Sequence, residues 1–276
     1  MALVSRIIRF SCVDGPGNRL VIFFQGCNFT CTYCHNPETI RGCTSCGICV
    51  YECPVKALSI VEGKVLWDSE ICISCDNCIK SCPHMSSPRV KDYSVDELFS
   101  IISKTAPFIE GITVSGGECT LNAGFLTELF RRVKNELHLT CFVDTNGGVD
   151  LSAFPELIEL TDSFMLDIKS IEAEEHLRLT GMPNEIVLKN LHMLLYTDKL
   201  YEVRTVIAPG SDSEKTVAAV AEIIKDKCAY KLLKYRKHGV RKQGLEIHGT
   251  FSPSDEYIDE MRQLAESKGA KTVISQ

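Results

Sequence analysis

The chain has 276 residues, enough for one or two domains with a sizeable core, and its 45% hydrophobic and 24% charged residues exclude wholesale disorder. It carries 30 basic and 36 acidic residues, so its net charge is −6. Because phosphate binding normally needs a basic face, this charge argues against a nucleic-acid partner.

The predicted elements begin with a buried strand at Leu20–Phe24, followed by a helix at Tyr93–Lys104 with Ser94 as N-cap and Glu97 as its capping-box partner. The chain then alternates strands and helices in this order: Gly111–Ser115 (strand), Asn122–Leu137 (helix), Leu139–Asp144 (strand), Phe154–Leu160 (helix), Ser163–Asp167 (strand), Glu172–Leu179 and Glu185–Thr197 (helices), Leu200–Ile207 (strand), Ser211–Lys227 (helix), Tyr230–Tyr235 (strand) and Ser254–Lys268 (helix). This alternation predicts a parallel sheet of six strands with helices outside. Residues 236–276 are expected to offer only one helix and a short tail.

Fifteen cysteines are the unusual feature of the composition, and twelve of them lie before residue 83. Met1–Phe10 does not have the form of a signal peptide, since Arg6 and Arg9 interrupt its apolar stretch. Leu20–Phe24 is far too short to span a membrane. We therefore expect a cytoplasmic protein without a membrane partner, in which crowded thiols bind metal instead of forming disulfides.

Eight cysteines form an internal repeat, C-x2-C-x2-C-x3-C-P, which begins at Cys43 and again at Cys72. This is the spacing of bacterial ferredoxins with two 4Fe-4S clusters, in which the fourth cysteine of each copy ligates the other cluster. The crossover predicts two ligand sets: Cys43, Cys46, Cys49 and Cys82 for the first cluster, and Cys72, Cys75, Cys78 and Cys53 for the second. A pair of zinc sites is the alternative, although zinc motifs usually separate two CxxC pairs.

Cys27, Cys31 and Cys34 form a third motif, C-x3-C-x2-C, with no fourth cysteine close behind. Three thiolates would leave one iron of a cubane open, and an open position distinguishes a catalytic metal site from a structural one. The alternative is a structural cluster completed by a distant cysteine, either Cys12 or Cys119.

The three-cysteine stretch, with Tyr33 before its last cysteine, resembles the radical S-adenosylmethionine (SAM) enzymes. Val13–Arg19, Phe24–Cys27 and Cys34–Pro37 narrow the resemblance to the activating enzymes of glycyl radical enzymes, such as pyruvate formate-lyase activating enzyme. Several members carry a two-cluster ferredoxin region after these cysteines. The resemblance implies a partial (β/α)6 TIM-like barrel in residues 1–40 and 87–276, with an inserted bacterial-ferredoxin-like domain in residues 41–86.

Further motifs stand where predicted strands end, the edge at which α/β folds place their active sites. Two glycines allow a ligand to approach the backbone closely, and a carboxylate can accept hydrogen bonds from an ammonium group. By resemblance, these residues would contact SAM: Gly116, Gly117, Glu118, Asp144, Thr145, Asp167, Lys169, Arg204 and His238.

Several of these assignments have alternatives. Asp144 and Asp167 match positions that help to bind a monovalent cation in a relative, whereas Asp167 and Lys169 could instead form a weak surface ion pair. Arg236 occupies the position of the family's SAM-contacting His, so either Arg236 or His238 would take that contact.

Four cysteines remain outside the three motifs and are expected to be small buried hydrophobes: Cys12, Cys119, Cys141 and Cys228. Cys119 follows Glu118, where relatives commonly have proline, and we expect it to fill space.

The function implied by the resemblance is reductive cleavage of SAM to methionine and a 5′-deoxyadenosyl radical, which abstracts hydrogen from a backbone glycine of a partner glycyl radical enzyme. Three 4Fe-4S clusters would serve it, one at SAM and two auxiliary. Reduced flavodoxin or ferredoxin would supply electrons, and the chain is expected to be a monomer. Two alternatives stay open: radical SAM chemistry on a small molecule, and a simple electron-transfer ferredoxin.

Overall fold

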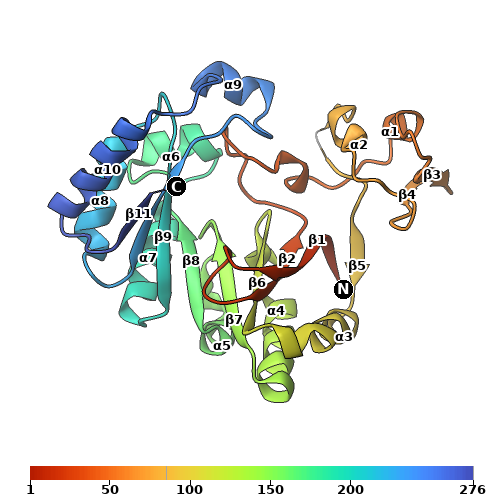
Figure 1. The fold of residues 1–276 in the computed structure, drawn as a ribbon, viewed down its shortest axis with the longest axis horizontal. Helices are drawn as coiled ribbons and strands as arrows, with labels where there is room; N and C mark the ends of the chain where they lie inside the picture. The colour runs from red at the N-terminus through yellow and green to blue at the C-terminus, as the bar shows by residue number, and fades with distance from the viewer. Residues whose placement is uncertain (85, 276) are drawn as a thin grey trace.

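A computed structural model describes residues 1–84 and 86–275 (Figure 1). Its centre is a nine-stranded sheet in the order β11-β10-β9-β8-β7-β6-β2-β1-β5. The strands have these bounds: β1 Ala2–Ser11, β2 Arg19–Phe24, β5 Lys91–Tyr93, β6 Gly111–Gly116, β7 Thr140–Thr145, β8 Ser163–Asp167, β9 Leu200–Ile207, β10 Ala229–Lys234 and β11 Val273–Ser275.

The six predicted strands are confirmed as β2, β6, β7, β8, β9 and β10, which are parallel and lie side by side in chain order. β11 adds a further parallel strand beside β10, and β1 and β5 continue the other side of the sheet as antiparallel strands. The sheet is therefore open, with β11 and β5 at its two edges. All carboxyl ends of the parallel strands meet along one rim, where the predicted site residues were expected.

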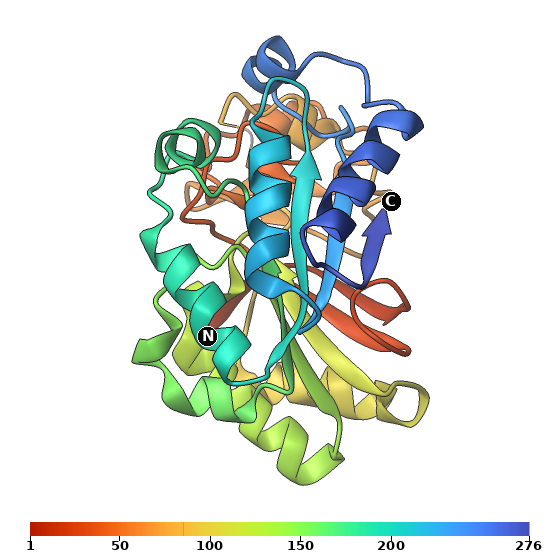
Figure 2. The same cartoon turned by 90° about the vertical axis from the view of Figure 1, so that its left-hand side faces the viewer.

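Helices cover the outer face of the sheet, and Figure 2 shows α8 and α10 standing in front of the strands. The helices of the α/β body have these bounds: α3 Val95–Thr105, α4 Ala123–Arg132, α5 Pro155–Leu160, α6 Ala173–Thr180, α7 Glu185–Tyr196, α8 Ser213–Ile224, α9 Lys242–His248 and α10 Asp255–Ser267. The predicted capping box of Ser94 and Glu97 is present at the start of α3. No described helix is long and apolar enough to cross a membrane.

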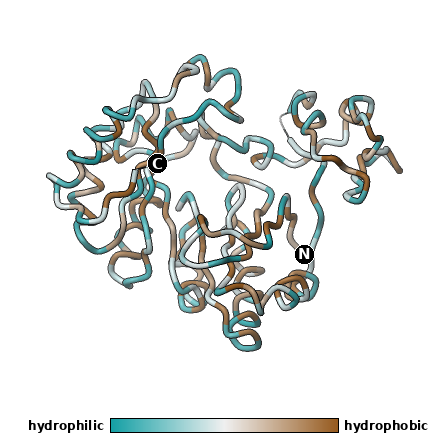
Figure 3. Tube along the Cα trace, in the orientation of Figure 1, coloured by the Kyte–Doolittle hydropathy of each residue, from teal (hydrophilic) through white to brown (hydrophobic). Residues whose placement is uncertain are grey.

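The core lies between the sheet and these helices. Five of the six residues of β6 are buried, as a strand covered on both faces requires. Figure 3 shows the same pattern along the chain, with hydrophobic stretches on the central strands and hydrophilic colour at many outer turns.

The carboxyl-terminal part of the chain is larger than the sequence predicted. Residues 236–276 contain α9, α10 and β11, so the expectation of one helix and a short tail is wrong. α9 is short and contains Gly244, which hides its helical periodicity, and β11 has only three residues.

Residues 41–84 and 86 form a lobe beside the sheet, seen at the right of Figure 1. It contains α1 Ile48–Tyr51, the antiparallel hairpin of β3 Leu58–Val61 and β4 Lys64–Trp67, and α2 Asn77–Lys80. A small hydrophobic cluster of its own centres on Cys49, Leu58 and Cys78. We call this lobe the insert.

Candidate functional site

Residues 27–34, here called the cluster loop, begin where β2 ends and cross the rim of the sheet. The last turn of α6 holds the middle of this loop: the Thr30 N–H donates to Thr180 O and the Thr32 N–H to Leu179 O, both at 2.8 Å. The chain thus fixes the cluster loop by main-chain bonds to an element far away in sequence.

The thiols of Cys27, Cys31 and Cys34 are partly buried and close enough to repel one another when ionised. Burial is the main cause that raises the pKa of Cys27 to about 12 and that of Cys31 to about 11, and the charges of the neighbouring thiols contribute to both rises. Three thiolates can therefore share this loop only when cations balance them, as in a metal site.

Neither Cys12 nor Cys119 is placed to complete this set. Cys12 follows β1, and because β1 runs antiparallel to β2, it lies at the opposite end of β2 from the cluster loop. The buried Cys119 thiol donates to the main-chain oxygen of Asp144 at 3.3 Å. Cys119 thus fills space within the core, as expected.

Gly116 and Gly117 allow the end of β6 to lie against the end of β2. A Cβ on Gly117 would lie 2.2 Å from Gly26 O, and one on Gly116 would lie 2.3 Å from both N and O of Phe24. The Gly117 N–H donates to Phe24 O at 2.9 Å, and the Glu118 N–H to Gly26 O at 2.8 Å. These glycines are needed for the chain's own backbone, whereas the motif alone suggested room for a ligand.

The Glu118 carboxylate is 1% exposed and joins the turns that follow β6 and β7. Its Oε1 accepts from Thr120 N at 2.9 Å, Thr120 Oγ1 at 2.6 Å and Thr145 Oγ1 at 2.8 Å, and its Oε2 accepts from Asn146 N at 2.7 Å. Burial raises the pKa of Glu118, and these hydrogen bonds oppose that rise. The contact with a ligand's ammonium stays a prediction, while the bonds observed give Glu118 a positioning role.

Asn146 is a site residue that the sequence analysis did not select. Its Nδ2 donates to Asn28 Oδ1 at 3.0 Å and lies 3.6 Å from Cys27 Sγ. Because Glu118 fixes the Asn146 peptide, the Glu118 carboxylate is linked through Asn146 to the first cysteine of the cluster loop. The signal was available, since Asn146 directly follows Asp144 and Thr145, which the sequence analysis selected.

Inside the rim, Arg204 and Asp144 form a buried ion pair, Nη1 to Oδ1, at 3.0 Å. Arg204 Nε donates to Glu202 Oε1 at 2.5 Å, and Ser115 Oγ donates to the second oxygen of Asp144 at 2.9 Å. Burial lowers the pKa of Arg204, but the three carboxylates of Asp144, Asp167 and Glu202 outweigh it and raise the pKa. Arg204 lies within β9, as the predicted strand Leu200–Ile207 requires, and stands beside Asp167. Sequence reasoning had no signal for Glu202.

Lys169 and Asp167 form a second pair, Nζ to Oδ2, at 2.7 Å, with side chains 11% and 24% exposed. The ion pair that the alternative foresaw is therefore present, but it is partly buried and does not lie on the surface. The Lys169 ammonium also lies 5.9 Å from the ring centroid of Tyr33 in the cluster loop. Burial lowers the pKa of Lys169, but the charges of Asp167, Tyr33 and Cys31 raise it well above its usual value. The rim thus holds a permanent cation beside the cluster loop.

The carboxyl-terminal segment packs on the cluster loop. The buried His248 of α9 hydrogen-bonds through Nε2 to Thr32 Oγ1 at 2.8 Å and through Nδ1 to Pro209 O at 2.7 Å. A Cβ on Gly244 would lie 1.8 Å from Thr32 O, so glycine is needed at this approach. His248 is a second residue that sequence reasoning missed, because nothing local marks it.

His238 and Arg236 are both exposed, and both lie near His35, which follows the cluster loop. The His35 Nε2 hydrogen-bonds to the main-chain oxygen of Arg236 at 2.9 Å. Both candidates for the missing family His therefore stand beside the cluster loop.

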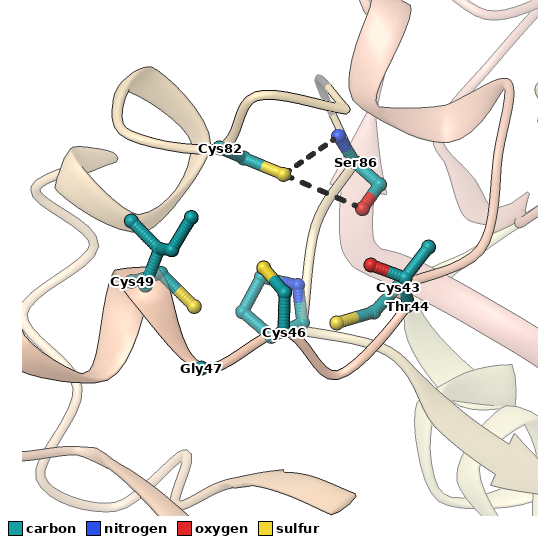
Figure 4. Close-up of a pocket in the computed structure, with 9 residues that line it drawn as sticks. Cys43, Thr44, Cys46, Gly47, Cys49, Cys82 and Ser86 are labelled. Atoms are coloured by element: carbon teal, nitrogen blue, oxygen red, sulfur yellow. Dashed lines mark hydrogen bonds between the residues drawn. The ribbon is translucent and has the colours of Figure 1, made fainter.

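Each predicted ligand set of the insert lines one cavity. Cys43, Cys46, Cys49 and Cys82 line one cavity, which is open to solvent (Figure 4). The other four cysteines, Cys72, Cys75, Cys78 and Cys53, line a second cavity. The thiols of each predicted set therefore lie together, and their role as cluster ligands stays a prediction.

All fifteen cysteines are free. Cys119 and Cys141 are buried and Cys228 is partly buried, but Cys12 is exposed, so the expectation of a buried Cys12 is wrong. It follows the final residue of β1, at a bend where no sheet covers it. Among the described residues, no group of three metal-binding side chains could hold a single metal ion.

The family comparison decides the class of this site, because the radical SAM superfamily matches residues 21–225. The chain belongs to the radical SAM superfamily. The predicted superfamily is confirmed, and the family implies a 4Fe-4S cluster and SAM as cofactors.

The curated relatives of this radical SAM enzyme are activating enzymes of glycyl radical enzymes, as the resemblance implied. The chain is 30% identical over 302 residues to the trans-4-hydroxy-L-proline dehydratase activating enzyme of Clostridioides difficile, covering 99% of this chain and 98% of the relative. It is 29% identical over 308 residues to the indoleacetate decarboxylase activating enzyme of Tractidigestivibacter scatoligenes, covering 99% and 97%.

A solved structure supports the fold over the whole length. The crystal structure of QueE from Escherichia coli superposes with a TM-score of 0.58 at 11% identity, covering 100% of this chain and 93% of that one. At this identity the match concerns the fold alone, and the predicted α/β architecture is confirmed by it.

Proposed function

We propose that this radical SAM enzyme activates a glycyl radical enzyme by abstracting a hydrogen atom from the Cα of a glycine in the partner's backbone. The observation that carries the proposal is the cluster loop: three thiols, with no fourth cysteine placed beside them among the described residues, stand on the rim that also holds Asp144, Lys169 and Arg204. The full-length similarity to activating enzymes supports the choice of a protein substrate.

The residues of the cluster loop fit a 4Fe-4S cluster, because three mutually repelling thiols need cations and the Asn146 amide lies near one sulfur. When bound, the cluster supplies an open iron position for SAM and the electron that cleaves its sulfur–carbon bond. The protein supplies orientation and exclusion of water.

The charges of the rim suit a zwitterionic ligand such as the methionyl part of SAM. The Lys169 ammonium would pair with the SAM carboxylate, and Asp144 would accept from its ammonium group. Arg204 would hold Asp144 in place, since all three of its nitrogens already donate within the chain. The second N–H of Nη1 and of Nη2 would remain for SAM oxygens. Gly116, Gly117, Glu118 and Thr145 would shape the floor of this pocket, and His238 would cover its adenosine side.

Asp144 and Asp167 would also bind a monovalent cation. Burial raises the pKa of Asp144, Arg204 opposes the rise, and the neighbouring Asp167 carboxylate adds to it. A cation between the two carboxylates would offset this repulsion.

The insert would carry two auxiliary 4Fe-4S clusters, one in each four-thiol cavity, with residues 41–86 as its extent. It would accept electrons from reduced flavodoxin or ferredoxin and pass them toward the cluster loop. Free thiols throughout agree with a cytoplasmic location. The enzyme would act as a monomer. Because α9 packs on the cluster loop, the carboxyl-terminal segment covers part of the rim.

Electron paramagnetic resonance tests the proposal. Reconstituted, reduced enzyme, SAM and the candidate glycyl radical enzyme should produce a glycine-centred doublet. Cys27→Ala should abolish both SAM cleavage and the doublet, whereas Cys12→Ala, a matched change of an exposed cysteine outside every ligand set, should leave both intact. SAM cleavage without a doublet on any partner protein would favour a small-molecule substrate instead.

A further inference from the structure

The two cavities of the insert come from one repeat, so their surroundings can be compared position by position at an offset of 29 residues. The peptide hydrogen bonds to sulfur are equivalent in both cavities: Ser45 N to Cys43 at 3.3 Å and Ser74 N to Cys72 at 3.5 Å, then Ala57 N to Cys53 at 3.2 Å and Ser86 N to Cys82 at 3.5 Å. Any difference between the two sites must therefore come from other groups.

The first difference is a charged pair that only the second copy has. Gly47 and Ile60 are neighbours in the first copy, and at their equivalent positions the second copy has Asp76 and Arg89. Asp76 has a φ of 62°, in the left-handed region that favours the glycine of the first copy. Its carboxylate bonds the guanidinium of Arg89, whose side chain is only 18% exposed and lines the second cavity. The strained aspartate thus fixes a partly buried cation beside the second ligand set.

The second difference is the indole of Trp67. Its Nε1 is inaccessible to solvent and lies close to the Cys72 thiol without completing a hydrogen bond to any described residue, while the ring lines the cavity with Cys72. A buried N–H without an acceptor is costly unless a group that is absent from the coordinates receives it. A cluster bound by Cys72 would present such an acceptor in its sulfurs.

The first cavity has no comparable donors. None of the described residues that line it is charged, and its one added contact is the Ser86 hydroxyl, 3.7 Å from Cys82 Sγ (Figure 4). We propose that Arg89, oriented by Asp76, and the N–H of Trp67 raise the reduction potential of the second cluster above that of the first.

The physical reason is charge. One-electron reduction adds one negative charge to a cluster, and hydrogen bonds to its sulfurs and a nearby cation stabilise the added charge. An electron on the first cluster then moves to the second: the first is oxidised by one electron and the second is reduced by one. At equilibrium, a single electron in the insert is therefore located mainly on the second cluster. This inference depends on the two auxiliary clusters of the proposed function.

The test is a redox titration followed by electron paramagnetic resonance, using full-length chain with Cys27→Ala to remove the cluster of the loop. Iron and sulfide content is measured first. If the chain binds no auxiliary clusters, the proposed function is at fault; if both are present, the titration judges the inference alone. Two one-electron steps are expected, with the second cluster reduced first.

The matched variants exchange the two copies. Asp76→Gly with Arg89→Ile gives the second site the residues of the first and should lower its potential, shifting the electron distribution at least tenfold, about 59 mV for one electron. Arg89→Lys should lower the potential of the second cluster by less, because it keeps a positive charge there. Trp67→Phe should also lower the potential of the second cluster and leave that of the first unchanged. Gly47→Asp with Ile60→Arg should raise the potential of the first cluster and so reduce the difference between the two potentials.

One result would overturn the inference: the clusters remain bound, and none of the variants Arg89→Lys, Trp67→Phe and Asp76→Gly with Arg89→Ile shifts the reduction potential of the second cluster from its wild-type value. Equal shifts of both steps would overturn it as well, since they indicate a general change of the insert. If the double variant loses a cluster, Trp67→Phe and Arg89→Lys still decide the question.

Discussion

Replacing Glu118 probes the link between the strand-end turns and the cluster loop. Glu118→Ala leaves the buried N–H groups of Thr120 and Asn146 and two hydroxyls without their acceptor. Glu118→Gln keeps an oxygen toward Thr120 and Thr145 but turns an amide toward the Asn146 N–H. Both variants remove the buried charge, so its desolvation cost cancels when the two are compared.

The difference between the variants follows from the bonds that only Gln retains. Three bonds accepted by Oε1, at roughly 0.5–1.5 kcal/mol each, make Glu118→Ala less stable than Glu118→Gln by about 2–4 kcal/mol. Urea unfolding of the reduced chain measures both free energies. Glu128→Ala, at an exposed position of α4, should change stability by less than about 0.5 kcal/mol. Equal stabilities for the Ala and Gln variants would refute the positioning role of Glu118.

Three further predictions concern glycine, the carboxyl-terminal segment and pH. Gly117→Ala should destabilise the chain by about 1–3 kcal/mol, because its Cβ meets Gly26 O. Gly124→Ala, in open space on α4, should stabilise the chain by roughly 0.5–1 kcal/mol. If both variants shift the urea midpoint in the same direction from the wild-type value, the prediction is contradicted. His248→Ala should speed amide hydrogen exchange in residues 27–34, because the bond to Thr32 is lost, and unchanged rates there would show that α9 does not hold the loop. Burial lowers the pKa of His176 and His248 below 6.5, so their contribution to stability is present above about pH 6.5 and is lost as the pH falls toward the lowered values. The urea midpoint should therefore decrease when the pH is lowered from about 7 to about 5.5, and a midpoint that stays constant would contradict this assignment.

The sequence predicted elements well where local signals are strong. β8 and β9 begin and end at the predicted residues because short apolar runs bounded by polar residues mark them, and Ser94 with Glu97 marked the start of α3. β1 was missed because it mixes exposed and buried positions around two register shifts, so it lacks a clean alternation.

The candidate site also contains some residues that local sequence signals predicted and others that they did not. Cysteine spacing was sufficient to predict which thiols of the insert lie together at each cavity, since a motif fixes its own geometry. That these thiols are cluster ligands stays a prediction. The groups that distinguish the sites are brought to them by the fold: Trp67 comes from the hairpin, and His248 from α9. No local pattern marks such contacts, because they depend on tertiary packing.

Transfer of a glycine hydrogen into 5′-deoxyadenosine tests the central claim most directly. The candidate glycyl radical enzyme is prepared with glycine deuterated at Cα and incubated with reduced enzyme and SAM, and the 5′-deoxyadenosine is analysed by mass spectrometry. We predict one deuterium in the product together with a glycine-centred radical on the partner. Product without deuterium, formed while the partner stays free of the radical, would contradict the account.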